Sequence, residues 1–113
     1  MIDNMEKTEA LLGKMRGVLP MSAFVSAELY WTLVKKSPEL VYSRQCQITE
    51  ITYLGDDGGI MCHLDLSTHG QENAHIVSIT HLSFDRRSPL SRDIRTYQKH
   101  RTKHLKKLQG RLF

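Results

Sequence analysis

Five cations recur along the C-terminal part of the sequence at a spacing that places them on one side of a helix. Stepping about 100° per residue from Leu90, they fall within an arc of about 80°. These residues are Arg92, Arg95, Lys99, Lys103 and Lys106. No acidic residue follows Asp93, so no later carboxylate can pair with them. Because like charges at i,i+4 destabilise a helix, we expect this face to bind a polyanion through contacts with phosphates.

The charge of the chain is divided unevenly. Residues 1–84 hold six Lys and Arg and ten Asp and Glu, a net charge of −4, whereas residues 85–113 hold ten and two, a net charge of +8. A basic segment on an acidic body is typical of proteins that bind nucleic acid or another anionic surface. Arg86 and Arg87 precede the predicted helix and would support these contacts. No helix-turn-helix, zinc-finger or aromatic RNA-binding pattern is present, so we expect DNA or RNA binding with low sequence specificity.

Two other partners fit a basic amphipathic helix. An acidic protein would contact the same cations, which would make the chain a protein–protein adaptor or assembly factor. An anionic membrane surface would require a free apolar face with Trp or Phe. The apolar, inward side of this helix instead carries Leu90, Ile94, Tyr97, Leu105 and Leu108, and a small domain needs that side for packing. No apolar run approaches the roughly 18 residues of a membrane span.

Histidines and cysteines are the other residues that could do chemistry. His63 and Asp65 lie two apart in a predicted strand, and with His81 they would form the two-His-one-carboxylate set of a metal-dependent enzyme. Polar residues on the solvent side of an antiparallel sheet explain the same pattern, so this is our third interpretation. His100 and His104 lack the intervening Glu of a metalloprotease helix. We therefore predict no enzymatic activity, no metal and no cofactor.

Cys46 and Cys62 are the only cysteines. Their spacing supports neither a zinc site nor a disulfide framework, so we expect structural thiols. The first residues do not resemble a signal peptide. Both observations favour a reduced, cytoplasmic location.

The length of 113 residues predicts a single α+β domain spanning 1–113. Hydrophobic periodicity predicts two helices, a three-stranded antiparallel β-meander and a long basic C-terminal helix, in the order ααβββα and in two layers. The predicted ranges are helices at 4–17, 22–36 and about 89–109, and strands at 44–54, 60–66 and 75–84.

The residues at the turn between the first two predicted strands set their register. A type I′ turn at Asp57-Gly58 would place Asp56 opposite Gly59. The core face would then carry Ile51, Tyr53, Cys62, Leu64 and Leu66, and the other face Cys46, Glu50, Thr52, His63 and Asp65.

The second predicted helix, which Ser22 would cap, is the most hydrophobic. Phe24, Tyr30 and Trp31 would form a broad apolar surface on it. This surface exceeds what one sheet face covers, so we predict a homodimer through this helix.

Overall fold

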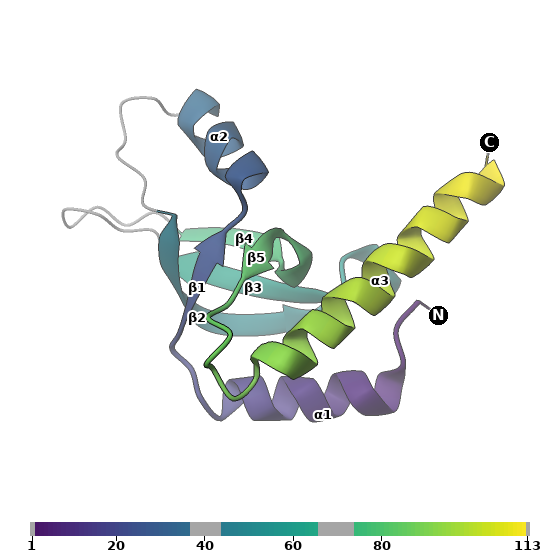
Figure 1. Ribbon diagram of the computed structural model, residues 1–113, viewed down its shortest axis with the longest axis horizontal. Helices are drawn as coiled ribbons and strands as arrows, with labels where there is room; N and C mark the ends of the chain where they lie inside the picture. The colour runs from purple at the N-terminus through teal and green to yellow at the C-terminus, as the bar shows by residue number, and fades with distance from the viewer. Residues whose placement is uncertain (1, 37–43, 66–73, 113) are drawn as a thin grey trace.

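A computed structural model describes residues 2–36, 44–65 and 74–112. This part of the chain forms three α-helices and a curled five-stranded antiparallel sheet, as Figure 1 shows. The helices are α1 (Met5–Arg16), α2 (Ala27–Lys36) and α3 (Ser91–Leu112). The strands are β1 (Met21–Val25), β2 (Gln45–Tyr53), β3 (Ile60–Asp65), β4 (Ala74–Ser78) and β5 (Leu82–Ser83). The α+β class is confirmed, but the three-stranded meander is wrong.

The strand order is β4-β3-β2-β1-β5, so β4 and β5 form opposite edges of the sheet. Only one 3-10 turn, η2 (Ile79–His81), separates these two strands in the sequence. The sheet therefore curls into a half-barrel, which lets so short a connection join its two edges. The predicted third strand at 75–84 pairs antiparallel with β3 in its first half, and its second half crosses to pair with β1.

Strand β1 occupies the start of the predicted second helix. Ala23 and Val25 are fully buried while Ser22 and Phe24 are exposed, which is the period of a strand. The helix begins after Ser26, whose hydroxyl accepts a hydrogen bond from the Leu29 N–H at 3.1 Å. A helix beginning at Ser22 is thus wrong, because five residues are too few to show a helical period and pairing with β2 decides their conformation.

The β2–β3 hairpin is confirmed, but its register differs from the prediction. Tyr53 lies opposite Ile60, and a 3-10 turn, η1 (Gly55–Asp57), replaces the predicted two-residue turn. This shift of two residues keeps Ile51 on the same face as Cys62 because side chains alternate with a period of two. Leu66, predicted for the core, lies outside the described residues.

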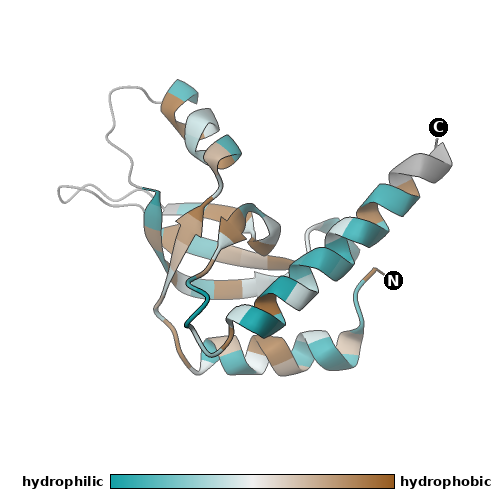
Figure 2. Cartoon of the chain, in the orientation of Figure 1, coloured by the Kyte–Doolittle hydropathy of each residue, from teal (hydrophilic) through white to brown (hydrophobic). Residues whose placement is uncertain are grey.

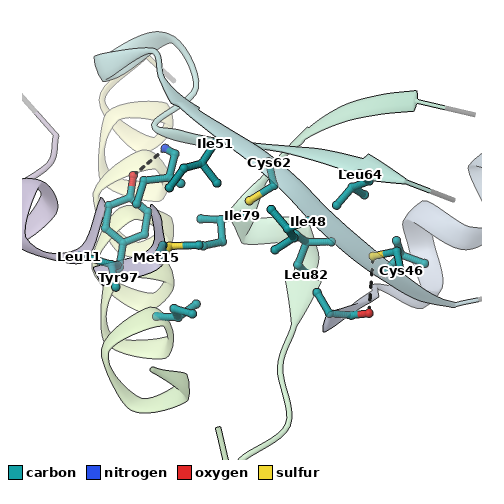
Figure 3. Close-up of a cluster of buried hydrophobic side chains, with 14 of the residues drawn as sticks. Leu11, Met15, Cys46, Ile48, Ile51, Cys62, Leu64, Ile79, Leu82 and Tyr97 are labelled. Atoms are coloured by element: carbon teal, nitrogen blue, oxygen red, sulfur yellow. Dashed lines mark hydrogen bonds between the residues drawn. The ribbon is translucent and has the colours of Figure 1, made fainter. Parts of the chain in front are cut away.

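A β-bulge between Ile48 and Glu50 reverses the alternation in the first half of β2. Cys46, predicted for the outer face, is therefore buried at 3% exposure. Its thiol donates to the Ala23 carbonyl oxygen at 3.5 Å, as Figure 3 shows.

Helices α1 and α3 cover one face of the sheet (Figure 1). Leu11 and Met15 from α1 and Tyr97 from α3 pack over the buried sheet residues (Figure 3), and Ile94 of α3 belongs to the same buried cluster. Helix α2 lies at the other end of the molecule and buries Leu33, whereas Trp31 is 59% exposed. Within the described ranges, no helix is both long enough and apolar enough to cross a membrane.

Candidate nucleic-acid interface

One side of α3 is held firmly against the body of the protein. Ile94 is fully buried, and Tyr97 and Arg101 are nearly so. Beyond Arg101 the helix extends past the sheet (Figure 1), and Leu108 is 45% exposed. The predicted burial of the inward side is therefore confirmed for the first half of the helix. Along the second half these side chains become more exposed.

All five cations predicted for the opposite side are exposed, and we call them the basic face: Arg92, Arg95, Lys99, Lys103 and Lys106. No residue of the basic face forms an ion pair with another described residue. Asp93, the last acidic residue of the chain, forms an ion pair with Lys14 of α1, with 3.3 Å between ammonium and carboxylate. In Figure 2 hydrophilic residues predominate along α3, with apolar residues between them. Successive members four residues apart lie about 6 Å apart along the helix axis.

Arg86 and Arg87 lie exposed in the turn before α3. The Arg87 guanidinium forms an ion pair with Asp85 at 3.1 Å, and this contact lowers the pKa of the Asp85 carboxyl. The charge of Arg87 is thus partly compensated, so among these two residues Arg86 is the stronger candidate for a phosphate contact.

A hollow of about 380 Å³ opens between α3 and η2 on one flank of the basic face. We call it the lysine hollow; its lining residues are Thr80, Gln98, Lys99, Thr102, Lys103 and Lys106. The Gln98 amide donates to the carbonyl oxygens of Ile79 and Leu82, both at 2.7 Å, and so fixes α3 to η2. Three lysines and two threonines line this open hollow, and their ammonium and hydroxyl groups can donate hydrogen bonds to a phosphate.

A buried polar cluster that the sequence pattern did not predict lies beneath α3. Asp3 Oδ2 accepts hydrogen bonds from the hydroxyls of Tyr53 and Tyr97, both at 2.8 Å, and from Arg101 Nη1 at 3.1 Å. The Arg101 guanidinium also donates to the carbonyl oxygens of Gly55 and Asp56. The signal was present in the sequence, because Arg101 falls on the apolar side of the predicted helix. A cation there requires a buried acceptor.

Burial and the neighbouring carboxylate keep the two phenols of this cluster protonated. Burial and the Asp3 carboxylate raise the pKa of Tyr53 to about 12, and they raise the pKa of Tyr97 further. Both phenols therefore remain protonated donors to Asp3 at neutral pH. The cluster ties the N-terminal segment and the β2–β3 turn to α3, and thereby sets the direction in which the basic face points.

His100 and His104 both contact the N-terminal segment. His100 Nε2 and His104 Nδ1 lie 3.2 and 3.3 Å from the same carbonyl oxygen, that of Ile2. Partial burial, with the neighbouring His100, Lys107 and Lys103, lowers the pKa of His104. Because of this lowered pKa, the His104 ring is uncharged at neutral pH.

The residues of the predicted metal-dependent enzyme are not assembled into a ligand set. His63 lies partly buried on the outer face of the sheet, 3.4 Å from the Thr52 hydroxyl. His81 lies in η2, where its carbonyl oxygen accepts from the Ser26 N–H, and not in a strand beside His63. Among the residues that the structure describes, no three His, Cys, Asp or Glu side chains gather to hold a metal.

Both cysteines are buried and unpaired with each other. Burial raises the pKa of the Cys46 thiol to about 11 and that of Cys62 to about 12. Neither thiol is an activated nucleophile at neutral pH, because the thiolate is the reactive form.

No family model, curated protein or solved structure matches this chain.

Proposed function

We propose that this protein binds nucleic acid through the phosphate backbone, with low sequence specificity, using the basic face of α3. One observation carries the proposal: five exposed cations, none in an ion pair with a described residue, share one side of a helix whose first half is fixed in the core by its other side. Like charges spaced four residues apart destabilise the helix that carries them. A polyanion relieves this repulsion and releases its own counterions, so the arrangement is favourable when the ligand is bound.

The rigidity of α3 supports the same function. Arg101 and Gln98 bind its first half to the β2–β3 turn and to η2. A charged surface on a fixed element loses little conformational freedom on binding. Arg92, Arg95, Lys99, Lys103 and Lys106 would contact phosphates, with Arg86 as a further contact and Arg87 contributing after release from Asp85.

A fluorescence titration against labelled duplex DNA, single-stranded DNA and RNA at several salt concentrations tests the proposal. Five phosphate contacts predict a slope of log K against log salt between about −3.5 and −4.5. The variant Lys99→Glu/Lys103→Glu should abolish binding. Its matched control is Lys35→Glu/Lys36→Glu at the exposed end of α2, which changes the net charge equally and should bind with only modest weakening.

An acidic protein would bind the same face, so charge reversal alone does not separate it from nucleic acid. Failure to bind any of the three nucleic acids at low salt would contradict the proposal. That result would favour the adaptor or assembly-factor function, with the basic face docked on an acidic partner.

A homodimer would strengthen polyanion binding by presenting two basic faces. The surface predicted for it is changed by the structure, because Phe24 lies in β1 and not on the helix with Tyr30 and Trp31. Phe24 and Trp31 are nevertheless exposed, and the Tyr30 and Trp31 rings pack edge to face at 5.5 Å. Sedimentation of Trp31→Ala beside the unmodified protein tests this association, since a dimer through α2 should dissociate in the variant.

A further inference from the structure

A second concavity lies on the flank of α3 opposite the lysine hollow. It occupies about 410 Å³ between α1 and α3, within the range of pockets that hold small organic groups. We call it the helix groove; its lining residues are Asn4, Lys7, Thr8, Ala10, Leu11, Lys14, Asp93, Thr96, Tyr97 and His100. Figure 1 shows the two helices side by side at the start of α3 and diverging toward the N-terminal end of α1.

The helix groove differs from the lysine hollow in chemistry. Its floor is formed by nearly buried side chains, those of Thr8, Leu11 and Tyr97. Its rim carries the Asn4 amide and the exposed His100 ring, which exchange hydrogen bonds, together with Lys7 and the Lys14–Asp93 ion pair. A mostly apolar floor with a few polar groups suits a flat heteroaromatic ring better than a phosphate.

The ridge of α3 separates the two concavities. By helical spacing, Thr96 and His100 face the helix groove, Lys99 and Lys106 face the lysine hollow, and Lys103 lies toward the ridge between them. A nucleic-acid strand that lies along the ridge of α3 would therefore have the cations of the lysine hollow on one side. On its other side it would have the helix groove with its mostly apolar floor.

We infer that the nucleic acid is single-stranded, with its phosphates over the lysine hollow and one or more bases in the helix groove. This inference rests on the proposed function and names its substrate class. In a duplex the bases are paired and stacked inside, so they cannot enter a groove beside the phosphates. A single strand leaves its bases free, and insertion of a base adds affinity that is independent of sequence.

The test compares ligands of equal length and different base content on the unmodified protein. The probes are an oligothymidylate of about 15 nucleotides, an abasic oligomer of the same length, and the corresponding duplex. We expect the oligothymidylate to bind about tenfold more tightly than the abasic oligomer. We also expect it to bind more tightly than the duplex at equal salt.

A variant that fills the helix groove without changing charge sharpens the test. Ala10→Leu/Thr96→Leu should remove the preference for oligothymidylate and leave binding of the abasic oligomer unchanged. The control is Ala27→Leu/Thr32→Leu on α2, where both residues are exposed. Thr32 also matches Thr96 in its own hydrogen bond, because each hydroxyl donates at 3.0 Å to the carbonyl oxygen four residues earlier.

The outcomes separate the two proposals. Equal affinity for the oligothymidylate and the abasic oligomer would overturn the inference and leave phosphate binding intact. Tighter binding of the duplex would overturn it as well. If none of the three probes binds at low salt, the proposed function itself fails.

Discussion

Helix α3 carries cations in two opposite environments: Arg101 is buried, and the basic face is exposed. Arg101 is 3% exposed and donates to a carboxylate and two carbonyl oxygens. Lys99 and Lys103, two residues before and after it, are exposed and form no ion pair with a described residue. The positive charge of Arg101 therefore contributes to the fold, whereas the same charge on Lys99 and Lys103 remains available to a ligand.

The difference between these sets follows from their surroundings. A buried cation must be paired and hydrogen-bonded, since the low dielectric around it penalises a lone charge. An exposed cation is solvated and screened, so it contributes little to stability and remains free to exchange water for phosphate. Substitutions in the buried cluster should thus change stability, and those in the basic face should change binding.

The largest effect is expected when the buried pair is broken. Asp3→Asn leaves Arg101 without a counter-charge and should lower the free energy of unfolding by about 3–5 kcal/mol, measured by urea denaturation. The control is Asp93→Asn, which breaks the exposed pair with Lys14 and should cost less than about 1 kcal/mol. Equal losses in the two variants would contradict a special role for the buried cluster.

A smaller loss is expected at the turn that accommodates the cluster. Gly59 has a φ of +69°, and an added Cβ would meet the Tyr97 hydroxyl and lie 2.8 Å from Arg101 Cζ. Gly59→Ala should therefore destabilise by about 2–4 kcal/mol. Gly55→Ala is the control, since Gly55 has a similar φ of +59° but open space around it. Its loss should be limited to backbone strain, about 1–2 kcal/mol, and thermal denaturation of both variants separates the two contributions.

Alkaline pH should weaken the buried cluster of Asp3, Tyr53, Tyr97 and Arg101. The pKa of Tyr53 is raised from 10 to about 12, and that of Tyr97 is raised further. Above pH 10 the unfolded chain releases phenolic protons that the folded protein keeps, so stability falls as the pH rises. We expect this decline between pH 10 and 12, followed by tyrosinate absorbance and urea denaturation. The decline in stability should be smaller in Tyr53→Phe. A stability that does not change with pH in this range would contradict the raised pKa values of the two phenols.

The smallest change in stability is expected on the basic face, and with the opposite sign. Lys99→Glu replaces like-charge pairs with Arg95 and Lys103 by opposite-charge pairs, worth about 0.2–0.5 kcal/mol each. The variant should therefore be slightly more stable while its affinity for nucleic acid falls. A marked loss of stability in urea denaturation would show that Lys99 makes a structural contact. An unchanged affinity for nucleic acid would show that Lys99 does not take part in binding.

Local sequence determined the elements that have a long, regular pattern. The helix predicted at 4–17 is α1, the hairpin predicted at 44–66 is β2 and β3, and the basic helix predicted at about 89–109 is α3 at Ser91–Leu112. In each, repeated contacts within one element or across one turn favour the same conformation. The inward position of Ile94 and Tyr97 and the exposure of the basic face follow from helical spacing alone.

Tertiary structure decided what short segments and buried polar groups do. Strands β1 and β5 are too short for their sequences to distinguish a strand from a helix, and they form because β2 and β1 provide partners. The bulge in β2 moved Cys46 into the core, since an extra residue reverses every side chain beyond it. Asp3 and Arg101 are 98 residues apart in the chain, and no local rule joins them. Charge and periodicity are properties of a segment, whereas burial, pairing and the choice of counter-charge depend on contacts that only the folded chain brings together.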